Sequence, residues 1–127
     1  MKYLCLVHCA PAVFEAMSRA DFDALAEESM AYDRALDSQG RLIAAEALMP
    51  AKAARVVQRR EGRVTHTDGP LRTDLTEPLV GFVLIDAPDL ETATRLAGGI
   101  PLARHGRIEV RAVFEGDGGG AAAEERR

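Results

Sequence analysis

The sequence predicts an α+β fold in which two helices cover one face of a four-stranded antiparallel sheet. Two long apolar runs, KYLCLV at residues 2–7 and LVGFVLIDAP at residues 79–88, have the length and character of buried strands. An amphipathic segment with helical spacing follows each run. With an intervening hairpin set aside, the order of elements is βαββαβ, the ferredoxin-like split βαβ arrangement.

The longer helix has recognisable signals at both ends. Ser18 is a suitable N-cap, and Asp21 follows three residues later, as in a capping box. Mostly apolar residues then recur every three or four positions over residues 20–38, with Ser29 on the same face. Gly40 follows, where a left-handed residue commonly ends a helix.

The other elements are shorter. The hairpin is polar, which suits an edge of the sheet or an excursion from it. We expect a connection at residues 10–17, a second strand at 41–50, hairpin strands at 54–59 and 63–67, a short helix at 90–97 and a last strand at 106–114.

The topology also predicts an assembly. In a βαββαβ sheet the first and third core strands are central, and these are the two apolar runs. Two helices cover only one face of the sheet, yet both central strands carry apolar residues at successive positions. An exposed apolar face usually marks an association surface. We therefore expect a homodimer that packs sheet face against sheet face.

Composition indicates one globular domain. The chain has 127 residues, of which 47% are hydrophobic and 28% charged. We assign the domain to residues 1–115, followed at residues 116–127 by a flexible tail of glycine, alanine and charged residues. No apolar run is long enough to span a membrane, and the N-terminus fits a first strand better than a signal peptide, so we expect a cytoplasmic protein.

Charge and cysteine spacing exclude several function classes. The net charge is −4, and the 14 arginines and two lysines are scattered among acids, so we expect no direct binding to nucleic acid. Cys5 and Cys9 would lie about 13 Å apart in a strand, too far for a disulfide. With His8 they would point to opposite faces, and no second Cys/His pair follows, so we expect buried thiols and no metal.

His8 and Glu46 are the first two candidate catalytic residues. His8 ends the first strand on the same face as Leu4 and Leu6, where a histidine can act as acid or base. The alternative is a hydrogen-bonded histidine at the rim of the sheet. Glu46 is an isolated carboxylate in an apolar strand, which favours either a site with a perturbed pKa or an ion pair with an arginine.

Asp68 and Arg104 complete the candidate site. Asp68 could orient a histidine or bind a substrate, or it could fix the turn by accepting backbone hydrogen bonds. Arg104 precedes the last strand and could anchor an anionic ligand, or it could be exposed loop charge. His66 is expected to face solvent on the hairpin. No nucleophile elbow, phosphate-binding loop, dinucleotide fingerprint or zinc spacing occurs, so we expect no cofactor.

Four stretches carry a resemblance to a known family. VTHTDGPLRTD, LVGFVLIDAPDLETA and GGIPLARHGRIEVRAV occur in this order, after YDRALDSQGRLIAAEALMP. Together they resemble the YCII-related family, in the subgroup named for a DGPF motif, over residues 1–115. The resemblance implies a ferredoxin-like fold and a dimeric α/β barrel. Asp-Gly-Pro between a hairpin and an apolar strand is the specific part, and IP-x-A-R after the second helix supports it.

The resemblance implies less about activity. In some members a His–Asp pair has been interpreted as an active site, and distant dimeric-barrel relatives are small-molecule enzymes. DGPF members often lie near genes of extracytoplasmic-function sigma factors, which suggests regulation. This chain departs from the pattern twice. Leu71 stands where the subgroup has phenylalanine, and the long helix has Ser29 and Met30 where some relatives place a histidine.

The sequence is therefore consistent with two functions. The first is a dimeric small-molecule-binding or regulatory protein, in association with a sigma-factor system. The second is a cofactor-free enzyme that uses acid–base chemistry on a small anionic substrate, with His8, Glu46 and Asp68 as catalytic residues and Arg104 as the substrate anchor. The missing helix histidine favours the first.

Overall fold

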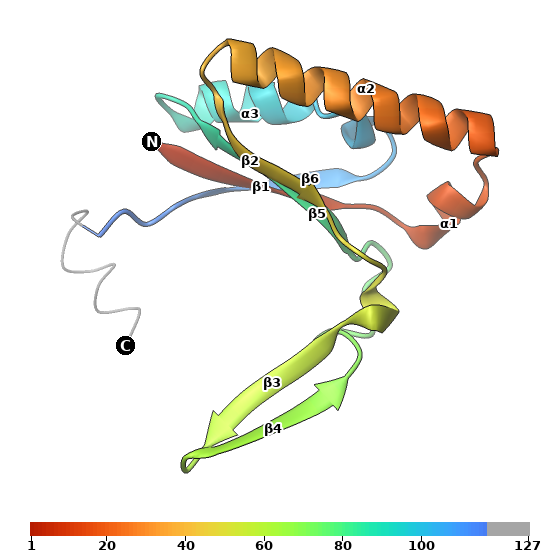
Figure 1. Ribbon diagram of the computed structural model, residues 1–127. Coiled ribbons are helices and arrows are strands. Elements are labelled where there is room, and N and C mark those ends of the chain that lie inside the picture. The colour runs from red at the N-terminus through yellow and green to blue at the C-terminus, as the bar shows by residue number, and fades with distance from the viewer. Residues whose placement is uncertain (117–127) are drawn as a thin grey trace.

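A computed structural model describes residues 1–116 and shows a four-stranded sheet, a helical layer and a separate hairpin (Figure 1). The elements run β1 (Lys2–His8), α1 (Pro11–Glu15), α2 (Arg19–Ser38), β2 (Leu42–Ala47), a 3₁₀ turn (Ala51–Ala53), β3 (Arg55–Arg60), β4 (Arg63–Asp68), β5 (Leu79–Asp86), α3 (Leu90–Gly98), a second 3₁₀ turn (Pro101–Arg104) and β6 (Arg107–Ala112). The expected tail lies almost entirely outside the described residues.

The sheet confirms the predicted topology. Its strand order is β2-β5-β1-β6, and every neighbouring pair is antiparallel. The two apolar runs are the central strands β1 and β5, which pair over their whole length from Lys2 opposite Asp86 to His8 opposite Leu79. The sheet of one chain is open and does not close into a barrel, so the dimeric barrel stays an expectation about two chains.

Both long helices lie on one face of the sheet, as expected (Figure 1). Ser18 accepts a hydrogen bond from the Asp21 amide at 3.0 Å and begins α2, and Asp89 does the same for α3 with the Thr92 amide at 2.8 Å. The core between helices and sheet consists of alternate strand residues and apolar helix residues: Tyr3, Cys5, Val7, Leu36, Val83, Ile85, Ala87, Ala93, Ala97 and Ile100.

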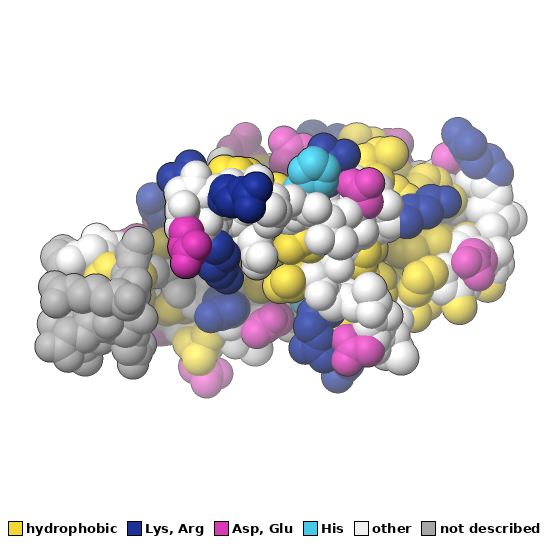
Figure 2. All heavy atoms as spheres, turned by 90° about the horizontal axis from the view of Figure 1, so that it is seen from below, with side chains coloured by type: hydrophobic (Ala, Val, Ile, Leu, Met, Phe, Trp, Pro, Cys, Tyr) yellow, Lys and Arg dark blue, Asp and Glu magenta, His cyan; other side chains and the backbone are white. Residues whose placement is uncertain are grey.

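The other face of the sheet is uncovered in the single chain, as expected when both helices lie on one face. Leu4, Leu6, Phe82 and Leu84 on this face are half-buried. The neighbouring strand β6 adds charged residues to the same face. Figure 2, seen from this side, shows hydrophobic side chains interspersed with arginines, lysines and carboxylates.

The hairpin β3–β4 is an excursion from the sheet. It forms its own two-stranded sheet, and Figure 1 shows it projecting on the side away from α2 and α3. Its turn places Glu61 at φ 51° and Gly62 at φ 77°, the left-handed conformation that a tight turn requires. Of its strand residues only Val56 is even half-buried, and His66 is exposed as predicted.

The remaining differences concern short elements. The segment expected to be a connection contains α1, which begins at Pro11, a residue suited to the first helical turn. Strand β2 ends at Ala47, earlier than the predicted end at Pro50. Cys5 and Cys9 are free thiols and both are buried, as expected. No helix among the described residues combines the length and apolar character needed to cross a membrane.

Candidate functional site

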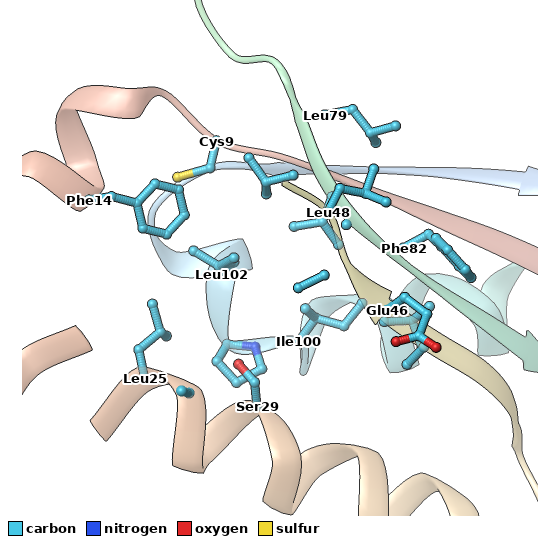
Figure 3. Close-up of a pocket in the computed structure, with 18 of the residues that line it drawn as sticks. Cys9, Phe14, Leu25, Ser29, Glu46, Leu48, Leu79, Phe82, Ile100 and Leu102 are labelled. Carbon is cyan, nitrogen blue, oxygen red and sulfur yellow. The ribbon is translucent and has the colours of Figure 1, made fainter. Parts of the chain in front are cut away.

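A cavity of about 890 Å³ lies between α2 and the end of the sheet where β1 finishes (Figure 3). Its walls come from α2, from β2 and the segment after it, from β5, and from the 3₁₀ turn Pro101–Arg104. Small residues explain the empty space. Ser29 on α2 faces a part of the sheet that carries Ala45, Ala47 and Gly81, so no large side chain fills the gap.

The cavity wall is mostly apolar. Figure 3 shows Phe14 and Leu25 on one side, with Leu102 and Ile100 next to them, Leu79 and Phe82 on β5, and Leu48 just after the end of β2. A volume and lining of this kind are typical of clefts that bind a small organic molecule. The wall supplies apolar contact, so specificity must come from the few polar groups.

Two polar side chains stand one helical turn apart on α2. Leu25, Ser29 and Asp33 follow at intervals of four residues, so all three lie along one line of the helix, and all three line the cavity. Ser29 and Asp33 are half-buried. Burial raises the pKa of the Asp33 carboxyl above its ordinary value, because desolvation disfavours the charged form.

The neighbouring Tyr32 has a structural role. Its hydroxyl donates a hydrogen bond to the Leu96 carbonyl oxygen at 2.6 Å, which ties α2 to α3. Burial raises its pKa, and Gly99 lies so close to the phenol ring that a side chain there would collide with it. The tyrosine therefore fixes the helix that presents Ser29 and Asp33.

Cys9 also lines the cavity. Its Sγ contacts the Ala10 carbonyl oxygen at 3.7 Å, and the residue is fully buried. Burial raises the pKa of the thiol, and the nearby Glu77 carboxylate adds to the effect. Both influences keep Cys9 protonated, which makes it a weak nucleophile in this setting.

Of the four predicted site residues, only Glu46 lines this cavity. It is exposed, and in the sheet it stands opposite Phe82. The alternative interpretation, an ion pair with an arginine, is not found among residues 1–116.

His8 lies at the rim of the sheet outside the residues that line the cavity. Its Nδ1 is 3.0 Å from the Glu77 carbonyl oxygen, and it stands opposite Arg107 on β6. Arg107 in turn forms an ion pair with the Glu77 carboxylate. The histidine shares its face with Leu4 and Leu6, as predicted, so it points to the side of the sheet away from the helices.

Asp68 is at the base of the hairpin and is exposed. Its Oδ1 accepts a hydrogen bond from Arg55 Nε at 2.9 Å, across the first pair of the ladder. The carboxylate was expected to fix the turn by accepting backbone hydrogen bonds. The backbone hydrogen bond at this turn instead runs from the Gly69 amide to the Ala54 carbonyl oxygen, at 2.8 Å. Gly69 has φ 110°, a conformation that favours glycine.

Arg104 is engaged by a carboxylate on α2. Its two terminal nitrogens donate to the two oxygens of Glu28 at 2.6 and 2.7 Å, a bidentate pair on the surface. The pairing lowers the pKa of Glu28. The guanidinium that was expected to anchor a substrate anion therefore already has an anion within the chain.

A single chain thus brings Glu46 to the cavity and leaves His8, Asp68 and Arg104 in three other places. Asp33 was not among the residues predicted from the sequence. Its signal was the spacing of four from Ser29, on a helix face that is otherwise apolar. The small residues of LIAAEA, which leave room for the cavity, were a second signal.

Within the described residues no group of three or more His, Cys, Asp or Glu side chains is arranged to hold a metal ion.

Comparison with known proteins places the chain in a family. No curated protein matches the sequence. The model of the YCII-related domain matches residues 1–117 and so covers the sheet, the helices, the hairpin and the cavity. The protein belongs to the YCII-related family.

Proposed function

We propose that this YCII-related protein binds a small organic molecule in the cavity between α2 and the sheet. The observation that carries the proposal is the cavity itself: about 890 Å³, walled by apolar side chains, with a few polar groups on one helix. Its size is in the range of sites for small ligands.

The acid–base enzyme is the alternative function and has less support. Its four residues do not line one cavity in a single chain, and Arg104 is occupied by Glu28. A catalytic role for His8, Glu46 and Asp68 and a substrate-binding role for Arg104 remain predictions. They can be tested separately from binding, because His8→Ala removes the candidate base and leaves the cavity wall intact.

A thermal-shift screen of metabolites tests the binding proposal. Ser29→Phe places a large side chain in the space that Ser29 leaves open, and Glu27→Phe is the matched control on an exposed position outside the cavity lining. We expect ligands that raise the melting temperature of the wild type to lose their effect on Ser29→Phe and to keep it on Glu27→Phe. Ligands that still stabilise Ser29→Phe would place binding elsewhere and contradict the proposal.

We also propose that the working molecule is a homodimer joined through the uncovered sheet face. Support comes from the half-buried apolar side chains of this face, and from the hairpin, which projects on the same side and would flank a second chain (Figure 1). Light scattering after size exclusion should give twice the chain mass of 13.7 kDa, and Leu6→Lys should give the mass of one chain. A monomeric wild type at micromolar concentration would contradict the dimer.

The resemblance to the DGPF subgroup supports a regulatory setting for the binding function. We propose that the protein acts in the cytoplasm beside an extracytoplasmic-function sigma factor. Deleting the gene should then change the transcripts that depend on that factor. Unchanged transcripts would leave a binding protein without this regulatory role.

A further inference from the structure

The charges around the cavity indicate the class of ligand. The ionisable side chains of aspartate, glutamate, lysine and arginine in its lining are Glu15, Asp33, Glu46 and Lys52. Carboxylates therefore outnumber ammonium groups along this lining, although Glu46 stands opposite Phe82 on the sheet face away from α2. A cavity with this balance disfavours an anion and favours a neutral or cationic molecule.

Asp33 is the carboxylate best placed to act as an anchor. Glu15, Glu46 and Lys52 are exposed, whereas Asp33 is half-buried against the apolar wall. Asp33 makes no hydrogen bond or ion pair with any of residues 1–116, and desolvation is the cause of its raised pKa. Partial burial of a carboxylate without a partner is unfavourable, and a cationic or hydrogen-donating ligand group would offset that cost.

Ser29 adds a second polar point one helical turn away. Its hydroxyl likewise makes no hydrogen bond within the described residues, and it is half-buried in the same wall. Tyr32 between them is already bound to the Leu96 carbonyl oxygen, so it holds the helix in place and leaves the other two free for a ligand. A carboxylate and a hydroxyl side by side accept hydrogen bonds from one ammonium group.

We propose that the ligand of this cavity is a small organic amine, whose apolar body contacts the wall and whose ammonium group pairs with Asp33 and Ser29. The inference rests on the proposed function, because it names the ligand class of the same cavity. It replaces the anionic substrate expected from Arg104, which Glu28 already pairs.

Three probes of the same shape test this proposal: phenylbutylamine, phenylbutanol and phenylbutanoate. Calorimetry should show the amine binding about tenfold more tightly than the alcohol, and the carboxylate binding most weakly, because a charge-assisted hydrogen bond is stronger than a neutral one. In Asp33→Asn we expect the amine to lose about tenfold in affinity while the alcohol is unchanged. Retained alcohol binding also shows that the variant is folded.

Asp37→Asn is the matched control. It removes the same charge from an exposed position one helical turn beyond Asp33, outside the cavity lining, and should leave the affinity for the amine unchanged. Equal binding of amine and alcohol, or an equal loss of both in Asp33→Asn, would overturn the ligand class and leave the binding function in place. If none of the three probes bound the wild type, the ligand class would fail, and the metabolite screen with Ser29→Phe would decide the cavity function separately.

Discussion

The four-stranded sheet and the β3–β4 hairpin are both antiparallel, but only the sheet is packed. Strands β1 and β5 place Cys5 and Ile85 under the helices, where they are almost fully buried. The hairpin has Val57 and Val64 on one face, and these are 60% and 59% exposed. Hydrogen-bond ladders of the same kind thus occur with very different amounts of buried apolar surface. Because burial supplies most of the stabilisation, the sheet should carry the stability of this chain and the hairpin little of it.

The largest effect should come from removing a core side chain. Ile85→Ala leaves a cavity under the helices and should lower the free energy of unfolding by about 2–5 kcal/mol. Val57→Ala in the hairpin should change it by less than about 0.5 kcal/mol, since its side chain is already exposed. Urea denaturation followed by circular dichroism measures both. Similar losses for the two variants would contradict the comparison.

Glycine substitutions provide a second comparison of the same two regions. At Gly81 in β5 an added Cβ would lie 2.8 Å from the Glu46 carbonyl oxygen, so Gly81→Ala must displace a neighbouring strand, at a cost of about 1–3 kcal/mol. At Gly62 in the hairpin turn nothing lies within 4 Å, and only the positive φ opposes alanine. Gly62→Ala should cost about 1 kcal/mol of local strain. Hydrogen exchange should show the Gly62→Ala effect confined to the hairpin amides.

Alkaline pH should weaken the sheet through a buried thiol. Burial raises the pKa of Cys5 from 9.0 to about 11, so the unfolded chain loses this proton at lower pH than the folded one. Stability is therefore full below pH 9.0 and falls as the pH rises towards about 11. The loss due to Cys5 should be about 1 kcal/mol at pH 10. Burial raises the pKa of Tyr32 as well, which acts in the same direction.

Chemical denaturation at several alkaline pH values measures this dependence. In Cys5→Ala the slope of stability against pH should be shallower than in the wild type, whatever the absolute stability of the variant. Identical slopes would show that the thiol does not titrate in this way.

The smallest effect is expected at Asp68, in the Asp-Gly-Pro stretch after the hairpin. Asp68 is 77% exposed and its partner Arg55 is 58% exposed, and an ion pair in this position contributes less than about 1 kcal/mol. Asp68→Asn should leave both the unfolding free energy and ligand binding nearly unchanged. A loss of ligand binding in Asp68→Asn, without a loss of stability, would restore Asp68 to the functional site.

Much of the fold could be predicted because its signals are local. The apolar runs of β1 and β5, the cap Ser18 and the hairpin each depend on a few neighbouring residues, and the structure confirms each of them. Strand ends were less predictable, as β2 shows by ending at Ala47, because the end of a strand depends on its partners.

The cavity was harder to predict, for the opposite reason. Chemistry-bearing residue types stood out in the sequence at His8, Asp68 and Arg104, but none of these lines the cavity. Asp33 looked like one of several acids on a charged helix. Its environment depends on Ala45, Ala47 and Gly81, which come from other elements and leave the space that it faces.

The sequence by itself determined the α+β class, the order of the elements, the central strands and the family, because periodicity, caps and turn residues act over short distances along the chain. Only the tertiary structure decided which polar groups share an environment. Arg104 was paired by Glu28, Asp68 by Arg55 and His8 by the Glu77 backbone, while Asp33 was left half-buried without a partner among residues 1–116. Pairing and burial depend on contacts between distant segments, and those contacts exist only once the chain has folded.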